Sequence, residues 1–294
     1  MLHARAVGVS FEATAMIGRQ KLYADPNELL ALLQAFGYRP DAADIDKIFG
    51  VDGGYAEAFL EFLGAKSAHS LDYSSFEGAT HVHDMNHPIP PGLKEQFSAV
   101  LDGGTLEHIF NFPTSLKNCM EMVRIGGHYL AITPANNFFG HGFYQFSPEL
   151  YFTTLSEDNG FELQRMYAFE ETSRPTWYSV RSPREARGRV TLTNSHGVYL
   201  LIIAKRVARR PIFEQTPQQS DYVDRWDSAP GSPAVEPRTL TRPLPIRLAK
   251  AVLPAPMRRS IRAAMSRPQP PRQGFDPRFF QPFDPTPPRG PKQA

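Results

Sequence analysis

The stretch LDYSSFEGATHVHDMN, Leu71 to Asn86, contains the ends of two short strand-like runs, and each run ends at an acidic residue. The run AHSLD ends at Asp72, and the run ATHVHD ends at Asp84. In open α/β sheets, ligands bind beyond the carboxyl ends of the strands. An acid at the end of the second strand commonly accepts hydrogen bonds from ribose hydroxyls. The two acids are therefore candidate ligand-binding residues.

Strand and helix patterns alternate on both sides of this stretch. Residues 27–36, NELLALLQAF, have apolar residues at helical spacing, preceded by Asp25 as a cap and Pro26 as the first helical residue. Downstream, the patterns predict a strand in FSAVLDGG, a helix in PTSLKNCMEMVRIGG and a buried strand in HYLAITPA. Residues 189–207 predict two more strands, joined by a turn at 194–197. This order predicts an α/β fold with a mostly parallel sheet, helices on both faces and an antiparallel C-terminal edge strand.

Two glycine-containing turns complete a series of four strand ends. We interpret DKIF, residues 46–49, as a first strand, and the following FGVDGGY as the turn from that strand into a helix. Glycines in such a turn let the backbone approach a ligand closely, with a helix N-terminus behind it. The second turn is LDGGTLEH, Leu101 to His108, after the strand in FSAVLDGG. Acids and glycines at four successive strand ends indicate a ligand site along one edge of the sheet.

In this pattern, residues 45 to 165 resemble the class I S-adenosylmethionine-dependent methyltransferases, which have a Rossmann-like fold. The resemblance implies S-adenosylmethionine as the cofactor. It implies that the loop after the first strand holds the methionine part, and that acids after the second and third strands bind the ribose and the adenine amino group. The cofactor-binding residues implied in this way are Gly50, Asp52 and Gly54 in the first loop, Asp72, Asp84 with Met85, and Gly104 in the fourth loop.

Three longer stretches resemble an uncharacterised bacterial methyltransferase group: LDYSSFEGATHVHDMN, LDGGTLEHIFNFP and NNFFGHGFYQFSPELYF. The first loop departs from the family pattern, acid-x-Gly-x-Gly-x-Gly. Ile48 stands where the acid is expected, and Asp52 replaces the middle glycine. This departure favours an alternative function, a catalytically inactive methyltransferase-like protein that serves as a binding or scaffold partner.

The run HVHDMNH, His81 to His87, has three histidines and an acid, as a metal site would. One class of zinc hydrolases uses H-x-H-x-D-H, and the spacing here is H-x-H-D-x-x-H. Along a strand, His81 and His83 share one face and Asp84 lies on the other. We therefore expect these histidines to be strand and loop residues that pack near Asp84, the acid implied to bind adenine, and we expect no metal site. A metal hydrolase is a third hypothesis, and it would require bound zinc.

The segment PANNFFGHGFYQFSPELYF, Pro134 to Phe152, combines amides, a histidine and a tyrosine with several phenylalanines. Connecting loops are normally polar, and an apolar wall with a few convergent polar groups is typical of a small-molecule pocket. An insertion whose aromatic residues fill the core is the alternative. An imidazole titrates near pH 6.5, which suits a base that removes the acceptor's proton. The candidates are His141, then His108, as the base, Tyr144 to orient the acceptor, and Asn136, Asn137 and Glu149 to bind it.

The charge distribution divides the chain. Residues 1–204 carry 15 Lys and Arg against 23 Asp and Glu, whereas residues 205–294 carry 17 against 7 and hold 18 of the 28 prolines. We predict an N-terminal helical lead-in or lid at 1–37, a methyltransferase-like domain at 38–206 and a basic, Pro-rich, partly disordered tail at 207–294. A single cysteine excludes an internal disulfide, and the chain shows neither a signal peptide nor a long apolar run. We expect a cytoplasmic protein.

Both ends of the chain have candidate contact segments. Phe11 to Gln20, FEATAMIGRQ, is either a lid whose Arg19 and Gln20 contact the ligand or a packing segment. Pro245 to Met265 interleaves basic and apolar residues, which suits either a solvated tail or peripheral contact with an anionic membrane. FDPRFFQPFDPT docks its phenylalanines on this chain or on a neighbour. We expect no nucleic-acid partner, because the basic residues are not interleaved with aromatic ones.

Together these patterns predict methyl transfer from S-adenosylmethionine to an O or N atom of a small-molecule acceptor, with a saccharide as one possibility.

Overall fold

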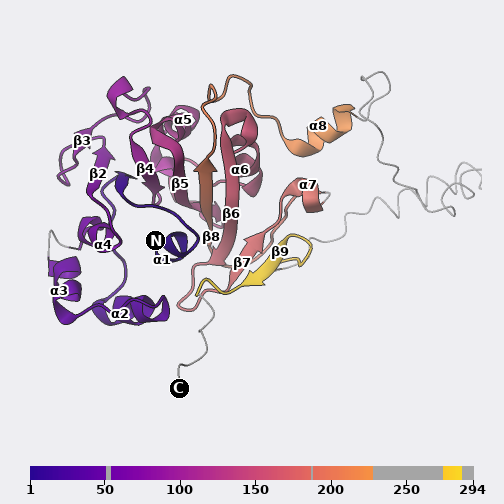
Figure 1. Cartoon of the computed structure of the whole chain (residues 1–294). Coiled ribbons are helices and arrows are strands. Elements are labelled where there is room, and N and C mark those ends of the chain that lie inside the picture. The colour runs from indigo at the N-terminus through magenta and orange to yellow at the C-terminus, as the bar shows by residue number, and fades with distance from the viewer. Residues whose placement is uncertain (51–53, 187, 228–273, 287–294) are drawn as a thin grey trace, which may run out of the picture.

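The computed structural model of the chain describes residues 1–50, 54–186, 188–227 and 274–286. Within these residues, nine strands form one sheet in the order β3-β2-β1-β4-β5-β8-β6-β7-β9 (Figure 1). Strands β1 to β5 run parallel, β8 is antiparallel to both β5 and β6, and β7 and β9 extend the antiparallel part. The strands are β1 Ala13–Ile17, β2 Ser67–Asp72, β3 His81–Val82, β4 Phe97–Asp102, β5 Val123–Asn136, β6 Phe161–Glu170, β7 Trp177–Val180, β8 Val198–Arg206 and β9 Phe280–Phe283.

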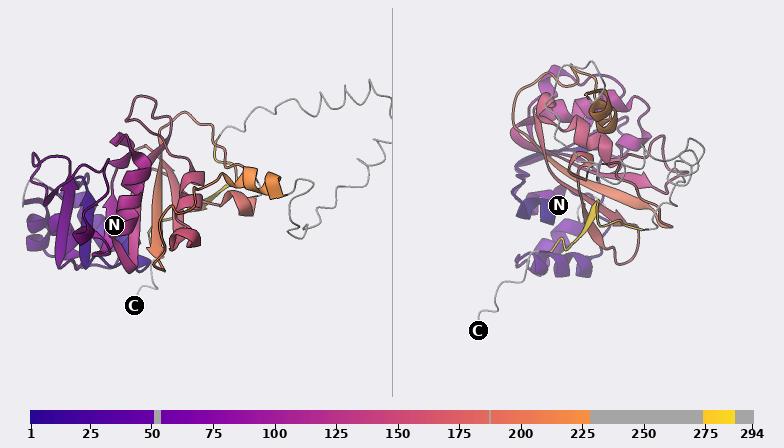
Figure 2. Two further views of the ribbon diagram at one scale, coloured as in Figure 1. Left: turned by 90° about the horizontal axis from the view of Figure 1, so that it is seen from above. Right: turned by 90° about the vertical axis from the view of Figure 1, so that its right-hand side faces the viewer.

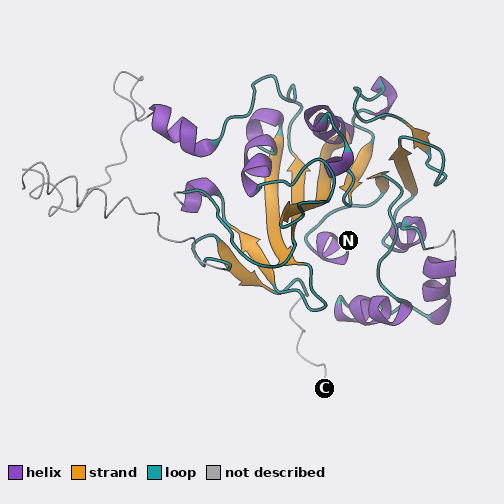
Figure 3. Ribbon diagram, turned by 180° about the vertical axis from the view of Figure 1, so that it is seen from behind, coloured by secondary structure: helices purple, strands orange, loops and turns teal. Residues whose placement is uncertain are grey.

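Helices cover both faces of the sheet, which Figures 1 and 3 show from opposite sides. One hydrophobic cluster contains residues of the helices α1, α2, α3 and α4 together with strand residues such as Met16 and Leu101. The other joins α5 and α6 to the alternate strand residues, such as Ile17 and Val100. The helices are α1 Leu2–Ala6, α2 Pro26–Ala35, α3 Ala42–Gly50, α4 Glu57–Phe62, α5 Phe112–Met122, α6 Pro148–Thr154, α7 Pro183–Ala186 and α8 Ser220–Asp227, with 3₁₀ turns η1 Pro91–Leu93, η2 Leu106–His108 and η3 Glu157–Asn159.

The first strand of the sheet is Ala13–Ile17, so the prediction of a strand in residues 46–49 is wrong. Strand β1 lies between β2 and β4, and Thr14 to Ile17 are fully buried there. Residues 46–49 belong to α3, in which buried Ile48 and half-buried Ile45 are three residues apart, at helical spacing. Residues 1–37, which we predicted as a lead-in, contain the central strand β1 and the helices α1 and α2.

The predicted C-terminal hairpin is replaced by a different pairing. Residues 189–193 contribute an isolated bridge between Thr193 and Gly274, whereas β8 enters the interior of the sheet between β5 and β6. The sequence VYLLIIAKR of β8 has buried residues on both faces, as expected of a strand in a sheet that is covered on both faces. The antiparallel edge strand is β9, from the segment that we predicted to dock its phenylalanines.

Strand β9 docks on the same chain. It pairs with β7, where Phe280 is buried and Phe283 stacks on Tyr167 with ring centroids 4.3 Å apart. The tail predicted at 207–294 therefore contributes to the sheet, at the end opposite β3 (Figure 2). The basic segment Pro245 to Met265 lies outside the described residues.

The topology confirms the predicted fold class, a Rossmann-like class I methyltransferase fold with a mostly parallel sheet, helices on both faces and an antiparallel C-terminal edge strand. The helix predicted at 27–36 is α2, and Asp25 caps it in a capping box with Glu28. None of the described helices is both long and apolar enough to span a membrane.

Candidate active site

The carboxyl ends of four parallel strands meet at one edge of the sheet. Ile17, the last residue of β1, is in register with Leu71 of β2 and with Asp102 of β4. Asp72 is in register with Val82 of β3, and its carbonyl accepts a hydrogen bond from His83 N at 2.8 Å. Gly18, Asp72, Asp84 and Asp102 therefore follow or end neighbouring strands at the same edge.

The turn after β1 depends on Gly18. Its backbone N donates to Leu71 O at 2.7 Å, and its φ of +69° lies in the left-handed region that favours glycine. A Cβ at this position would lie 2.9 Å from Thr105 Oγ1, which itself donates to Ile17 O at 2.7 Å. The Gln20 amide also donates to Ile17 O, at 2.6 Å, and its side chain packs on Gly103. This turn links β1 closely to the loop after β4.

Sequence reasoning missed Gly18 as the glycine of the first loop, although a weakly apolar run followed by glycine, ATAMIG, was the available signal. The predicted first-loop residues lie elsewhere. Gly50 ends α3 and Gly54 lies in the turn before α4, so neither follows the first strand. Asp52 lies outside the described residues.

Arg19 occupies the space between the β1 turn and the β2 loop. Its Nε donates to Glu57 Oε1 at 2.7 Å, its Nη1 donates to Glu77 O at 2.9 Å, and its guanidinium lies 4.1 Å from the centre of the Tyr55 ring. The side chain is 14% exposed. Arg19 therefore packs the segment after β1 against the segments before and after β2, as the packing alternative expected.

Asp72 and Asp84 each stabilise a local turn. Asp72 Oδ1 accepts from Ser74 N at 3.3 Å, while Asp84 Oδ1 accepts from Asn86 N at 2.9 Å and from its side-chain amide at 2.7 Å. The hydrogen bonds from Asn86 hold the pKa of Asp84 below its usual range. Met85 is buried in the core, so its side chain packs rather than facing the edge.

Asp102 ends β4 in a buried position. Its Oδ1 accepts from Thr105 N at 2.9 Å and Leu106 N at 3.3 Å, whereas its Oδ2 has no hydrogen-bond partner within the described part of the chain. Burial, with a smaller contribution from the charge of Glu107, raises the pKa of Asp102 to about 7. A cavity of about 190 Å³ borders this strand end, with Gln20, Ala56, Asp102, Gly103, Ile132 and Leu201 among its walls.

Glu107 brings His108 and His141 together. The carboxylate is 1% exposed, and its Oε1 lies 3.4 Å from His141 Nε2 and 4.0 Å from His108 Nε2. The histidine side chains are 44% and 49% exposed, and their rings meet edge to face with centroids 4.8 Å apart. Burial raises the pKa of Glu107 to about 7, and burial followed by the charge of His141 lowers the pKa of His108. The two predicted bases thus lie side by side, on a buried acid to which the sequence analysis assigned no role.

The other predicted acceptor residues have structural contacts. The Tyr144 hydroxyl donates to Phe110 O at 2.6 Å, and the ring packs with Phe112 and Phe146. The amides of Asn136 and Asn137 donate to Asn194 Oδ1, both at 2.9 Å, and so tie the end of β5 to the segment before β8.

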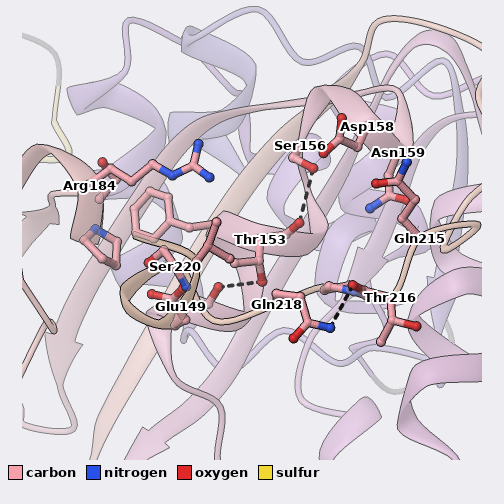
Figure 4. Close-up of a pocket in the computed structure, with 15 residues that line it drawn as sticks. Glu149, Thr153, Ser156, Asp158, Asn159, Arg184, Gln215, Thr216, Gln218 and Ser220 are labelled. Carbon is pink, nitrogen blue, oxygen red and sulfur yellow. Dashed lines mark hydrogen bonds between the residues drawn. The ribbon is translucent and has the colours of Figure 1, made fainter. Parts of the chain in front are cut away.

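Glu149 lies apart from the histidines, in a cleft of about 360 Å³ formed by α6, residues 182–184 and residues 215–223 (Figure 4). Its Oε1 accepts from Ser220 N at 2.6 Å. The structure therefore does not bring Glu149 to the site of His141.

The histidines of the HVHDMNH run do not converge. His81 Nε2 lies 3.1 Å from His69 Nδ1, on the neighbouring strand, and the two rings stack. His83 Nε2 lies 3.1 Å from His87 O, within the same loop. Among the described residues, three His, Cys, Asp or Glu side chains gather within ligand distance only at Glu107, His108 and His141.

Exposed aromatic side chains lie on the segments that follow β2, β4 and β5. Phe110 and Phe143 are 72% and 64% exposed and meet edge to face, at 5.7 Å between ring centroids, beside the two histidines in sequence. Phe139, in the loop after β5 that also contains Phe143, is fully exposed. Phe76, after β2, is also exposed. Solvent-exposed rings on the loops after β4 and β5 offer stacking surfaces for a planar or cyclic ligand.

The edge has the chemistry that S-adenosylmethionine would need. Carboxylates follow β2 and β3 for hydroxyl and amino donors, and the buried Asp102 Oδ2 lacks a donor among the described residues. Gly103 has no side chain, so its backbone and the Gln20 amide border the cavity directly. These residues fit a cation with hydroxyl and amino groups.

Neither a protein-family model nor a curated protein matches this chain. Solved structures with a similar fold include a candidate methyltransferase from Bacillus halodurans C-125, which is 13% identical with a TM-score of 0.41; the similarity covers 70% of this chain and 97% of that one. Another is the 1,6-didemethyltoxoflavin-N1-methyltransferase of Burkholderia thailandensis, with 1,6-didemethyltoxoflavin and S-adenosylhomocysteine bound, at 15% identity, a TM-score of 0.31, and coverage of 70% and 75%.

A third is a variant of the 16S rRNA (adenine(1408)-N(1))-methyltransferase of Catenulisporales acidiphilia, at 9% identity, a TM-score of 0.37, and coverage of 71% and 92%. One of these proteins was solved with a small molecule and another is named for ribosomal RNA. At these identities the likeness concerns the fold and does not identify an acceptor.

Proposed function

We propose that this protein transfers a methyl group from S-adenosylmethionine to an O or N atom of a small-molecule acceptor. The observation that carries the proposal is the shared edge at which Gly18, Asp72, Asp84 and Asp102 follow or end neighbouring strands of a Rossmann-like sheet. In such sheets ligands bind at the carboxyl ends of the strands, and an acid after the second strand accepts ribose hydroxyls.

In this proposal, each residue at the edge binds a different part of the cofactor. Asp72 accepts hydrogen bonds from the ribose, and Asp84 accepts one from the adenine amino group. The turn at Gly18 takes the role that the family resemblance implied for Gly50, Asp52 and Gly54. Asp102, whose Oδ2 lacks a partner among the described residues, faces the cationic part. The bound cofactor supplies an electrophilic methyl group on a sulfonium sulfur.

The acceptor side of the site is the cluster of Glu107, His108 and His141. Methyl transfer is an in-line displacement with a neutral leaving group, so the protein mainly positions the nucleophile and removes its proton. His141 and His108 are exposed enough to meet an acceptor and can accept that proton. Phe110 and Phe143 pack against the acceptor, and the Tyr144 hydroxyl holds the loop through Phe110 O. Asn136 and Asn137 shape this loop rather than contact the acceptor.

Calorimetric titration with S-adenosylmethionine and S-adenosylhomocysteine tests the cofactor site. We expect a Kd in the micromolar range, about −8 kcal/mol, for the native protein. Asp72→Asn should weaken binding by at least about tenfold, because a carboxylate that accepts two ribose hydroxyls becomes an amide. The matched control is Asp158→Asn, at an exposed position in η3. No binding up to about 1 mM, or equal losses in both variants, would contradict the proposal.

A non-catalytic binding protein is the second candidate, and Arg19 favours it. The guanidinium fills the space between the β1 turn and the β2 loop, where a glycine-rich first loop would leave room for a ligand. This candidate predicts that neither S-adenosylmethionine nor S-adenosylhomocysteine binds to the native protein. If the native protein binds both, a screen of hydroxyl and amine acceptors, read by S-adenosylhomocysteine formation, decides whether transfer occurs.

A further inference from the structure

The cluster of Glu107, His108 and His141 has the composition of a three-ligand metal site. It combines one carboxylate and two imidazoles from two loops, η2 after β4 and the loop after β5. One ligand atom from each residue lies within 4.8 Å of the others. No such convergence could be read from the sequence, because the residues that meet are 34 positions apart.

The distances suit a cation between the three side chains. Ligand atoms 2.0–2.1 Å from a tetrahedral zinc ion lie about 3.3 Å from one another. The distance from Glu107 Oε1 to His141 Nε2 is 3.4 Å, and that from Glu107 Oε1 to His108 Nε2 is 4.0 Å. The first matches, whereas the second is longer, so binding one ion with all three side chains requires the half-exposed His108 to move toward Glu107.

A second observation points to a ligand at this position. The Glu107 side chain is 1% exposed, and its Oε2 has no hydrogen-bond partner among the described residues. Burying a carboxylate oxygen without a donor is costly, and it is offset when the group is paired or coordinates a metal. Both histidines, by contrast, are about half exposed. A cation here would have protein ligands on the buried side and open positions toward solvent.

The backbone around Glu107 holds this arrangement in place. Glu107 O accepts hydrogen bonds from Phe143 N at 2.8 Å and from Tyr144 N at 3.3 Å, which fixes the His141 loop on η2. Gly142 has a φ of +67°, and a Cβ there would lie 2.8 Å from Glu107 O. A Cβ at Gly104 would lie 3.2 Å from Glu107 Oε1. The two loops can approach this closely because both positions are glycine.

We propose that Glu107, His108 and His141 bind one divalent transition-metal ion, with zinc as the best match, and leave at least one coordination position open. Two imidazoles and a carboxylate suit Zn²⁺, Co²⁺ or Fe²⁺, whereas Mg²⁺ and Ca²⁺ prefer oxygen ligands throughout. Three protein ligands with an open position are typical of catalytic zinc sites, in contrast to closed structural sites with four.

The site deepens the proposed function and depends on it for its role. An acceptor hydroxyl bound at the open position would lose its proton to solvent, because a bound cation lowers the pKa of an oxygen ligand. That oxygen then forms the bond to the methyl carbon while the bond from this carbon to sulfur breaks, which leaves S-adenosylhomocysteine neutral at sulfur. The favoured acceptor class is therefore a hydroxyl compound able to coordinate a metal. In this form His108 and His141 are ligands and do not serve as bases.

The test is metal binding by the 294-residue chain, which is first stripped of metal with a chelator and dialysed. It is titrated with ZnCl₂ by calorimetry and with CoCl₂ by visible absorption. We expect one ion per chain, with a cobalt spectrum of tetrahedral or five-coordinate type. His141→Asn and His108→Gln should each weaken zinc binding by more than about 10–100-fold. That range is typical when a residue that only hydrogen-bonds to a metal ligand is replaced. The control is His87→Asn. His87 is an exposed histidine of another loop, 3.7 Å from Asp84 Oδ2. Its replacement should change the affinity for zinc less than about twofold.

The outcomes separate this site from the cofactor site. His141 and His108 are half exposed, so their variants should fold, and thermal melting checks this. A stoichiometry below one ion per chain, or equal affinity for the native protein and both variants, would overturn the metal site. Binding of S-adenosylhomocysteine by the metal-free protein is measured in parallel. If that binding persists while zinc binding is absent, only the metal proposal fails; if zinc binds and the cofactor does not, only the proposed function fails.

Discussion

Replacing Gly18 by alanine tests whether the turn after β1 is needed for the proposed cofactor site at the carboxyl edge of the sheet. The position has a φ of +69°, and the new Cβ would lie 2.9 Å from Thr105 Oγ1. An alanine in the left-handed region costs about 1–2 kcal/mol. The Thr105 hydroxyl would also have to move, losing its 2.7 Å hydrogen bond to Ile17 O, which adds about 0.5–1.5 kcal/mol. We expect Gly18→Ala to lower the free energy of unfolding by about 1.5–3.5 kcal/mol.

Gly37→Ala is the matched control. Gly37 has a φ of +82° at the end of α2, and a Cβ there would meet nothing within 4 Å. It therefore pays only the conformational cost, about 1–2 kcal/mol. Urea unfolding followed by circular dichroism measures both variants, and calorimetry measures their affinity for S-adenosylhomocysteine. Gly18→Ala should lose affinity and Gly37→Ala should not. Equal destabilisation, or unchanged affinity in Gly18→Ala, would refute the assignment of this turn.

Two further predictions concern regions away from the site. Ion pairs with Lys66 and Arg124 lower the pKa of Glu12 from 4.5 to about 2. A depressed acidic pKa in the folded state means that this contribution is present above pH 4.5 and is lost as pH falls toward 2, so the melting temperature of the native protein should decline more steeply over this range than that of Glu12→Gln. Phe280→Ala, at a buried position of β9, should lower stability by about 3–5 kcal/mol, whereas Phe139→Ala, at a fully exposed position, should change it by less than about 0.5 kcal/mol. A stability loss below about 1 kcal/mol for Phe280→Ala in denaturant unfolding would show that β9 is not part of the cooperative unit.

The sequence predicted the candidate site residues where an acid directly ends a run with a recognisable strand pattern. Asp72, Asp84 and Asp102 each close an apolar or alternating run, so their position at a common edge follows from the parallel topology. Strand β1 was missed because ATAMI is a short run in which only Met16 and Ile17 are large apolar residues. The four residues DKIF fit a strand or a helix equally well, since so short a run cannot separate the two periods. Only the pairing partners β2 and β4 identify the first strand.

Long-range contacts account for the residues that could not be assigned from the sequence. The amides of Asn136 and Asn137 suggest an acceptor pocket, but Asn194, 57 or 58 positions away, accepts both. Glu149 is close to His141 in sequence, yet α6 carries it to another cleft. The meeting of Glu107 with His141 is equally non-local. In each case a polar residue type predicts a hydrogen bond, whereas the partner depends on how distant segments pack.

The loop after β4 connects the two halves of the proposed site. Thr105 holds the β1 turn through Ile17 O, and Glu107, two residues later, holds the β5 loop through Phe143 N. Gly104 lies against the Glu107 carboxylate, and the preceding Gly103 lies against Gln20. A displacement of this loop therefore moves the cofactor edge and the histidine cluster together. Binding at one half should therefore change the affinity of the other half for its ligand, because both depend on the same few backbone positions.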